Sequence, residues 1–106
     1  MTDDPRWAVL QSAKVQLLNQ FANRGVLRIE FISAFPTQVG THVWLCTRSD
    51  VQRDSLSKSS ELEAEVRDLL RSVGLPAADV DASGVVVQSE ETVDRDYDGS
   101  WFYALR

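Results

Sequence analysis

The sequence predicts an α+β domain, a two-layer sandwich in which helix–strand–strand occurs twice. Four antiparallel strands would then carry two helices on one face. Three observations support this fold class. Apolar residues recur at helical spacing over residues 7–21 and 62–73, they alternate over residues 27–31 and 43–47, and an Asp-Gly pair at 98–99 separates two alternating segments. We expect residues 1–106 to form a single domain, because this length supports one hydrophobic core.

The first helix is predicted to begin at Asp4, which can cap it. Pro5 then takes the first helical position, where its missing N–H has no intrahelical partner to lose. Gly25 is expected to end the helix in a left-handed turn. One face of this helix is apolar and comprises Trp7, Leu10, Ala13, Leu17, Leu18 and Phe21.

Two strands are predicted to follow, Val26 to Ala34 and Thr41 to Arg48, with a turn at residues 35–40. Because strand side chains alternate between faces, each strand has a buried and an open side. The expected buried residues are Leu27, Ile29 and Phe31 in the first strand and Val43, Leu45 and Thr47 in the second. The expected residues of the other face include Arg28, Glu30, His42, Trp44 and Cys46.

The polar run Ser49–Ser60 is interpreted as a connector with one helical turn near residues 51–56. Ser60 and Glu63 have the spacing of a capping box, which predicts that a second helix begins there. Its apolar face follows a 3.6-residue period and comprises Leu62, Val66, Leu69, Leu70 and Val73. Gly74 and Pro76 are expected to end this helix.

A third strand is predicted from near Gly84 and a fourth from Ser100 to Arg106. Two interpretations compete for the segment between them. Asp98-Gly99 between alternating residues favours a hairpin with a two-residue turn, since both turn positions require positive φ. The same segment resembles the start of an EF-hand calcium loop, but the twelfth loop position, which needs glutamate, falls on Leu105. We therefore favour the hairpin.

The hairpin register predicts a surface on the sheet face away from the helices. Clustered tryptophan and tyrosine side chains are typical of protein interfaces. The predicted partner-binding residues are Trp44, Asp94, Asp96, Trp101 and Tyr103. The formal net charge is −5, and acidic residues concentrate between residues 79 and 98. Such a surface repels phosphates, which argues against nucleic acid and in favour of a basic protein partner.

Signatures of catalysis and of cofactor binding are absent from the sequence. His42 and Cys46 lie four strand positions apart, about 13 Å, too far for a nucleophile–base pair. One cysteine and one histidine also fall short of a zinc site. Glycine-rich phosphate loops and serine nucleophile motifs do not occur. We expect no cofactor, and the weak metal candidates are Asp94, Asp96 and Asp98.

The leading hypothesis is a small acidic cytoplasmic protein-binding module, similar in size and charge to inhibitor, immunity or chaperone proteins. This expectation rests on three observations: no apolar run approaches a membrane span, residues 1–6 lack the basic-then-apolar order of a secretion signal, and Cys46 is the single cysteine. One alternative is a metal-binding protein or metal-dependent enzyme centred on residues 94–99. Another is a structural homodimer formed through the open sheet face or an edge strand.

Overall fold

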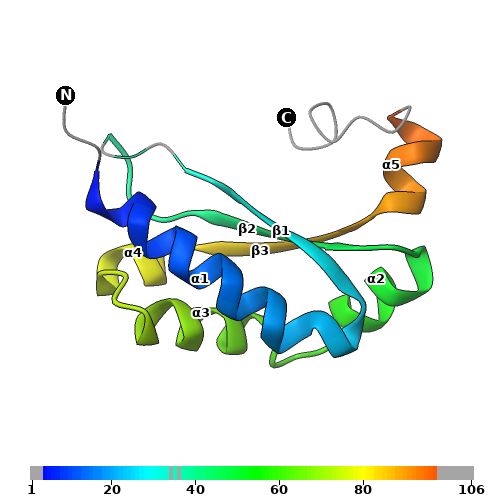
Figure 1. Ribbon diagram of the computed structural model, residues 1–106, viewed down its shortest axis with the longest axis horizontal. Helices are drawn as coiled ribbons and strands as arrows, with labels where there is room; N and C mark the ends of the chain where they lie inside the picture. Colours follow the sequence, from blue (N-terminus) through cyan, green and yellow to red (C-terminus); the bar gives the residue numbers. More distant parts are fainter. Residues whose placement is uncertain (1–3, 34, 36, 98–106) are drawn as a thin grey trace.

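The computed structural model describes residues 4–33, 35 and 37–97. Helices α1 to α4 lie together on one side of a small sheet, and α5 extends beyond it (Figure 1). The elements, in chain order, are α1 Pro5–Phe21, the 3₁₀ turn η1 Ala22–Arg24, β1 Val26–Ile32, β2 His42–Thr47, α2 Asp50–Ser57, α3 Leu62–Ser72, α4 Ala77–Asp81, β3 Gly84–Ser89 and α5 Glu90–Asp96.

Across the residues described here the sheet is three-stranded and mixed, so the predicted four-stranded antiparallel sheet is wrong. The strand order is β1-β2-β3; β1 and β2 are antiparallel, whereas β2 and β3 are parallel. Parallel neighbours need a long crossover connection. Here α2, α3 and α4 provide it, and they return the chain to the starting end of β2 before β3 begins. The general α+β class is confirmed.

The predicted start of α1 is confirmed in detail. Asp4 caps the helix by accepting a hydrogen bond from the Arg6 amide, and Pro5 is the first helical residue. After the short η1 turn, Gly25 adopts φ of +91°, a left-handed conformation that glycine reaches without a Cβ clash. The chain therefore leaves the helix and enters β1 where the sequence predicted.

Strand β1 departs from simple alternation at Leu27. Val26 pairs with Thr47 and Arg28 with Cys46, so an extra residue bulges out of the ladder between them. Leu27 is consequently exposed, although it was expected in the core. Beyond the bulge the predicted alternation holds, because Ile29 is buried and Phe31 packs against the core.

The region between β2 and β3 contains more helix than the sequence predicted. Ser49 and Gln52 form a complete capping box for α2, in the segment interpreted as a connector. The predicted Ser60–Glu63 capping box is not formed, because α3 begins after Glu61 and has no side-chain cap. The expected apolar face of α3 is confirmed. The short helix α4 was not predicted.

The predicted hairpin is also corrected, since its first arm is helical. Ser89 caps α5 by accepting a hydrogen bond from the Thr92 amide, and residues 90–96 form the helix. Local capping thus competes successfully with the alternating pattern of Val93–Asp96. The predicted turn at Asp98-Gly99 and the fourth strand at Ser100–Arg106 lie outside the described residues.

One hydrophobic core lies between the sheet and helices α1 to α4. Each of these helices contributes buried residues, among them Phe21, Leu56, Val66 and Val80. The strands contribute Ile29, Val43 and Leu45 from the face turned toward the helices. Among the described residues, no helix is both long and apolar enough to cross a membrane.

Candidate functional site

The sheet face opposite α1 to α4 carries Trp44 at its centre. Trp44 lies on the middle strand, paired with Glu30 of β1 and Val86 of β3. Its neighbours Val43 and Leu45 are fully buried on the helix side, so Trp44 points to the other face. Its side chain is half-buried. We call the set Arg28, Glu30, Trp44, Cys46, Val86 and Gln88 the Trp44 face.

The Trp44 face carries the ion pair of Arg28 with Glu30 and the buried thiol of Cys46. Arg28 and Glu30, two positions apart on the same face of β1, form a salt bridge of 3.0 Å. Cys46 is almost fully buried, and this burial raises the pKa of its thiol to about 12, against a smaller lowering by Arg28. The thiol is therefore protonated near neutral pH and is a poor nucleophile or metal ligand.

The predicted aspartates are not on the Trp44 face. Asp94 and Asp96 are exposed on α5. Val86, the β3 partner of Trp44, lies three positions before Ser89, so Trp44 is about 10 Å along the strand from the start of α5. The other two predicted binding residues, Trp101 and Tyr103, lie outside the described residues.

The metal candidates are also separated by the helix. Residues two apart on an α-helix point about 200° from each other, so Asp94 and Asp96 diverge. The described part of the chain contains no group of three or more potential metal-ligating side chains. Asp98 lies outside that part, and the metal hypothesis stays a prediction.

A polar cluster that the sequence did not reveal lies at the carboxyl ends of β2 and β3. Here Asp50 of α2 meets the first turns of α5. Asp50 accepts a hydrogen bond from the Ser89 hydroxyl, one of 2.7 Å from the Thr92 hydroxyl, and one of 3.0 Å from the Arg95 guanidinium. Arg53 lies 3.4 Å from the same carboxylate. We call these five residues the Asp50 cluster.

The Asp50 cluster is suited to holding two helices together and not to catalysis. Hydrogen bonds from Ser89, Thr92 and Arg95 hold the pKa of the Asp50 carboxyl well below its usual range. A carboxylate of such low basicity is a poor general base for the neighbouring Ser89 hydroxyl. The Ser89 and Thr92 hydroxyls both donate to Asp50, and the Thr92 hydroxyl also accepts a hydrogen bond of 2.6 Å from Arg53. A serine followed by an acid near the carboxyl end of a strand, at 49–50 and again at 89–90, is the sequence signal for this cluster.

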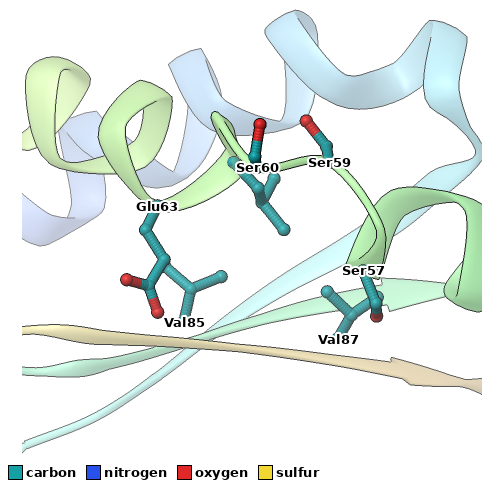
Figure 2. A pocket seen from close by; sticks show the side chains of 7 residues that line it. Ser57, Ser59, Ser60, Glu63, Val85 and Val87 are labelled. Carbon is teal, nitrogen blue, oxygen red and sulfur yellow. The ribbon is translucent and has the colours of Figure 1, made fainter.

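A cavity of about 310 Å³ lies beside β3, and we call it the β3 pocket. Figure 2 shows Val85 and Val87 rising from β3 as its floor, with the carboxylate of Glu63 directed toward Val85. The loop between α2 and α3 forms the opposite wall. The complete lining is Ser57, Ser59, Ser60, Leu62, Glu63, Val85 and Val87. This volume is at the lower end of ligand pockets, which suits a side chain better than a cofactor.

Comparison of the chain with protein-family models, with curated proteins and with solved structures found no match in any of the three.

Proposed function

We propose that this protein is a protein-binding module that holds a basic partner against the Trp44 face and the neighbouring acidic helix α5. The observation that carries the proposal is the position of Trp44, half-buried at the centre of the sheet and directed away from α1 to α4. A half-buried tryptophan offers a large rigid surface whose remaining area can be covered by a partner.

The charge on α5 supports a basic partner. This helix carries Glu90, Glu91, Asp94 and Asp96 against Arg95. Arg95 is already paired with Asp50 and Asp96, so it contributes little positive field to an incoming molecule. An acidic helix beside a sheet face that carries an aromatic anchor attracts a basic protein and orients it on approach. An inhibitor or immunity-type protein that covers a basic target, or a chaperone-type protein, fits this arrangement.

The proposal includes a cytoplasmic location, which the cysteine content supports. Cys46 is a free, buried cysteine. A chain with one unpaired thiol is typical of a reducing compartment.

The test is capture of a partner by immobilised protein from the native cell extract, with Trp44→Ala compared with Trp7→Ala. Trp7 is a matched control because it is a partly exposed tryptophan on α1, away from the Trp44 face. We expect wild type and Trp7→Ala to retain a basic protein that Trp44→Ala loses. Equal capture by all three chains would contradict the Trp44 face as the binding surface.

The charge requirement is tested separately by Asp94→Lys and Asp96→Lys together, with Asp81→Lys, at an exposed position that ends α4, as the control. We expect weaker capture by the α5 variant and a loss of capture as salt rises, since exposed charges are screened beyond about 10 Å at 0.1 M salt. Self-association that disappears with Trp44→Ala, measured by sedimentation velocity, would instead support a structural homodimer.

A further inference from the structure

Strand β3 is an edge of the sheet within the described residues, because β2 is its one neighbour there. The amide of Gly84 donates to the carbonyl of Thr41, so this position faces the preceding end of β2. Backbone groups alternate in direction along a strand. The N–H and C=O groups of Val85 and Val87 therefore point away from β2, toward the edge at which residues 4–33, 35 and 37–97 supply no further strand.

The same two valines form the floor of the β3 pocket. Their side chains project to the helix side of the sheet, where they pack against the core and leave the cavity above them (Figure 2). An edge with outward hydrogen-bonding groups thus runs directly beside a cavity of about 310 Å³. This combination is the arrangement used in strand addition, where backbone bonds give affinity and pockets for alternate side chains give specificity.

We propose that the β3 edge binds an extended segment of the basic partner as a fourth strand, with a lysine or arginine side chain entering the β3 pocket. Residues of the added strand that lie opposite Val85 and Val87 project to the same face as those valines. Two side chains spaced two residues apart therefore enter the pocket. One approaches Glu63, and the other lies nearer Ser57.

The lining of the β3 pocket favours a long cationic side chain at the added-strand position that approaches Glu63. Val85 and Leu62 provide apolar surface for the methylene stem, whereas Glu63 provides a carboxylate for the charged end. Arg67 forms a long ion pair of 3.7 Å with that carboxylate, and another of its nitrogens donates to the Ser83 carbonyl at 2.8 Å. An entering cationic group would add a shorter, charge-assisted hydrogen bond to this long pair. The serine hydroxyls of the α2–α3 loop can accept further hydrogen bonds from an ammonium or guanidinium group.

Charge argues against a second copy of the chain as the occupant. At a net charge of −5, two copies repel each other, whereas a basic segment is attracted. This inference rests on the proposed function for the basic partner, but it assigns a different contact surface. Binding at the Trp44 face and binding at the β3 edge are therefore tested by separate experiments.

The probe is a capped heptapeptide of alternating threonine and valine with a central lysine, titrated into the full-length protein. A second peptide with a central glutamate is its control. We expect the lysine peptide to bind more tightly, and Glu63→Gln to weaken its binding about twofold to fivefold, the range for one partly exposed ion pair. Glu61→Gln is the matched protein control, because Glu61 is exposed at the start of α3 and does not line the pocket.

The site is located by NMR shifts of the backbone amides during the titration. We expect the largest shifts at Val85 and Val87, and loss of binding in Val87→Pro. Proline is tolerated on an edge strand where the N–H faces outward, and a retained cooperative melt would verify folding. If Val87→Pro does not fold, the peptide affinity of Glu63→Gln still decides the test.

Three results would overturn the inference: no binding at millimolar peptide, equal binding of both peptides, or shifts confined to the Trp44 face. The last result would leave the proposed function standing. Conversely, a native partner that Trp44→Ala retains but Glu63→Gln loses would refute the Trp44 face and support the edge. A dimer that shifts Val85 and Val87 without peptide would show that the occupant is a second copy.

Discussion

At the scale of single residues, Asp50 joins two helices that are 40 positions apart in the sequence. Its backbone amide donates to the Glu91 carboxylate at 2.7 Å, while its own carboxylate accepts from three residues that belong to or cap α5. A longer acidic side chain at position 50 would displace these partners. Asp50 therefore holds the start of α5 beside the start of α2.

We predict that Asp50→Asn lowers the free energy of unfolding at neutral pH. The folded-state pKa of Asp50 is depressed, so its contribution is fully present above the ordinary carboxyl value of 3.8 and is lost as pH falls toward the folded pKa. The difference between wild type and variant should therefore narrow below pH 4. Denaturant unfolding across this range measures it, with exposed Asp81→Asn as the control. If the difference in unfolding free energy between wild type and Asp50→Asn did not change with pH, the charge of Asp50 would not be what stabilises the fold.

We predict that Cys46 reacts slowly with iodoacetamide in the folded protein. With the thiol pKa raised to about 12 by burial, about one thiol in ten thousand is ionised at pH 8. Urea at a denaturing concentration should restore the rate of an ordinary thiol. Mass spectrometry measures the labelled fraction with time, and glutathione is the reference. Labelling of folded protein as fast as glutathione would contradict the burial of Cys46.

At the scale of elements, two serines test where α2 and α3 begin. We predict that Ser49→Ala lowers the free energy of unfolding by about 1 kcal/mol, because it removes the side-chain cap of α2. Ser60→Ala should change it by less than about 0.5 kcal/mol, since Ser60 is exposed and caps no helix. Thermal or urea unfolding gives both values. A larger loss from Ser60→Ala would restore the sequence-based start of the second long helix.

The elements that could be predicted are those with strong local signals. Asp4 and Pro5 at one end and Gly25 at the other specify α1, because capping, a fixed φ and a left-handed turn act within a few residues. Val43 and Leu45 alternate with Trp44, which was enough to assign their faces. The bulge at Leu27 could not be predicted, since nothing in the local sequence marks the extra residue.

The strand direction of β3 and the helical state of residues 90–96 were missed for a different reason. A strand's pattern reports which residues are buried but not the direction of its neighbour. The direction depends on how α2, α3 and α4 return the chain. At residues 93–96, alternating apolar and polar side chains fit a strand, but the Ser89 cap acts first and favours helix.

For the candidate site, sequence reasoning found the aromatic anchor but not its surroundings. Alternation along β2 was sufficient to place Trp44 on the open face. The β3 pocket depends on the α2–α3 loop lying over β3, which is a long-range contact without a local signal. The Asp50 cluster likewise forms because the parallel strands β2 and β3 end side by side, which brings Asp50 next to Ser89.

At the scale of the whole molecule, one junction ties the N-terminal helix, the β1–β2 connection and α4 together. The buried Asp79 carboxylate accepts from the Arg6 guanidinium at 3.0 Å and from the Gly40 amide at 2.9 Å. Gly40 has φ of +88°, and a Cβ there would lie 2.8 Å from the Ala82 carbonyl oxygen. Three segments distant in sequence thus meet where glycine is required.

We predict that Gly40→Ala destabilises the fold more than Gly74→Ala. Both glycines have positive φ, but a Cβ at Gly74 meets nothing within 4 Å. Gly74→Ala should cost about 1 kcal/mol from backbone conformation alone. Gly40→Ala should cost roughly 2 to 4 kcal/mol, because the clash with Ala82 adds to it. Denaturant unfolding compares them, and equal losses would show that the junction adjusts freely.

The parallel pairing of β2 with β3 also has a consequence for the protein while it is being synthesised. When β2 has emerged from the ribosome, its partner on one side, β1, is already available, but β3 follows only after residue 83. Until then one edge of the central strand is unpaired and Leu45 lacks part of its cover. The nascent chain therefore passes through a stage with an exposed strand edge, and this stage ends when Gly84–Ser89 docks.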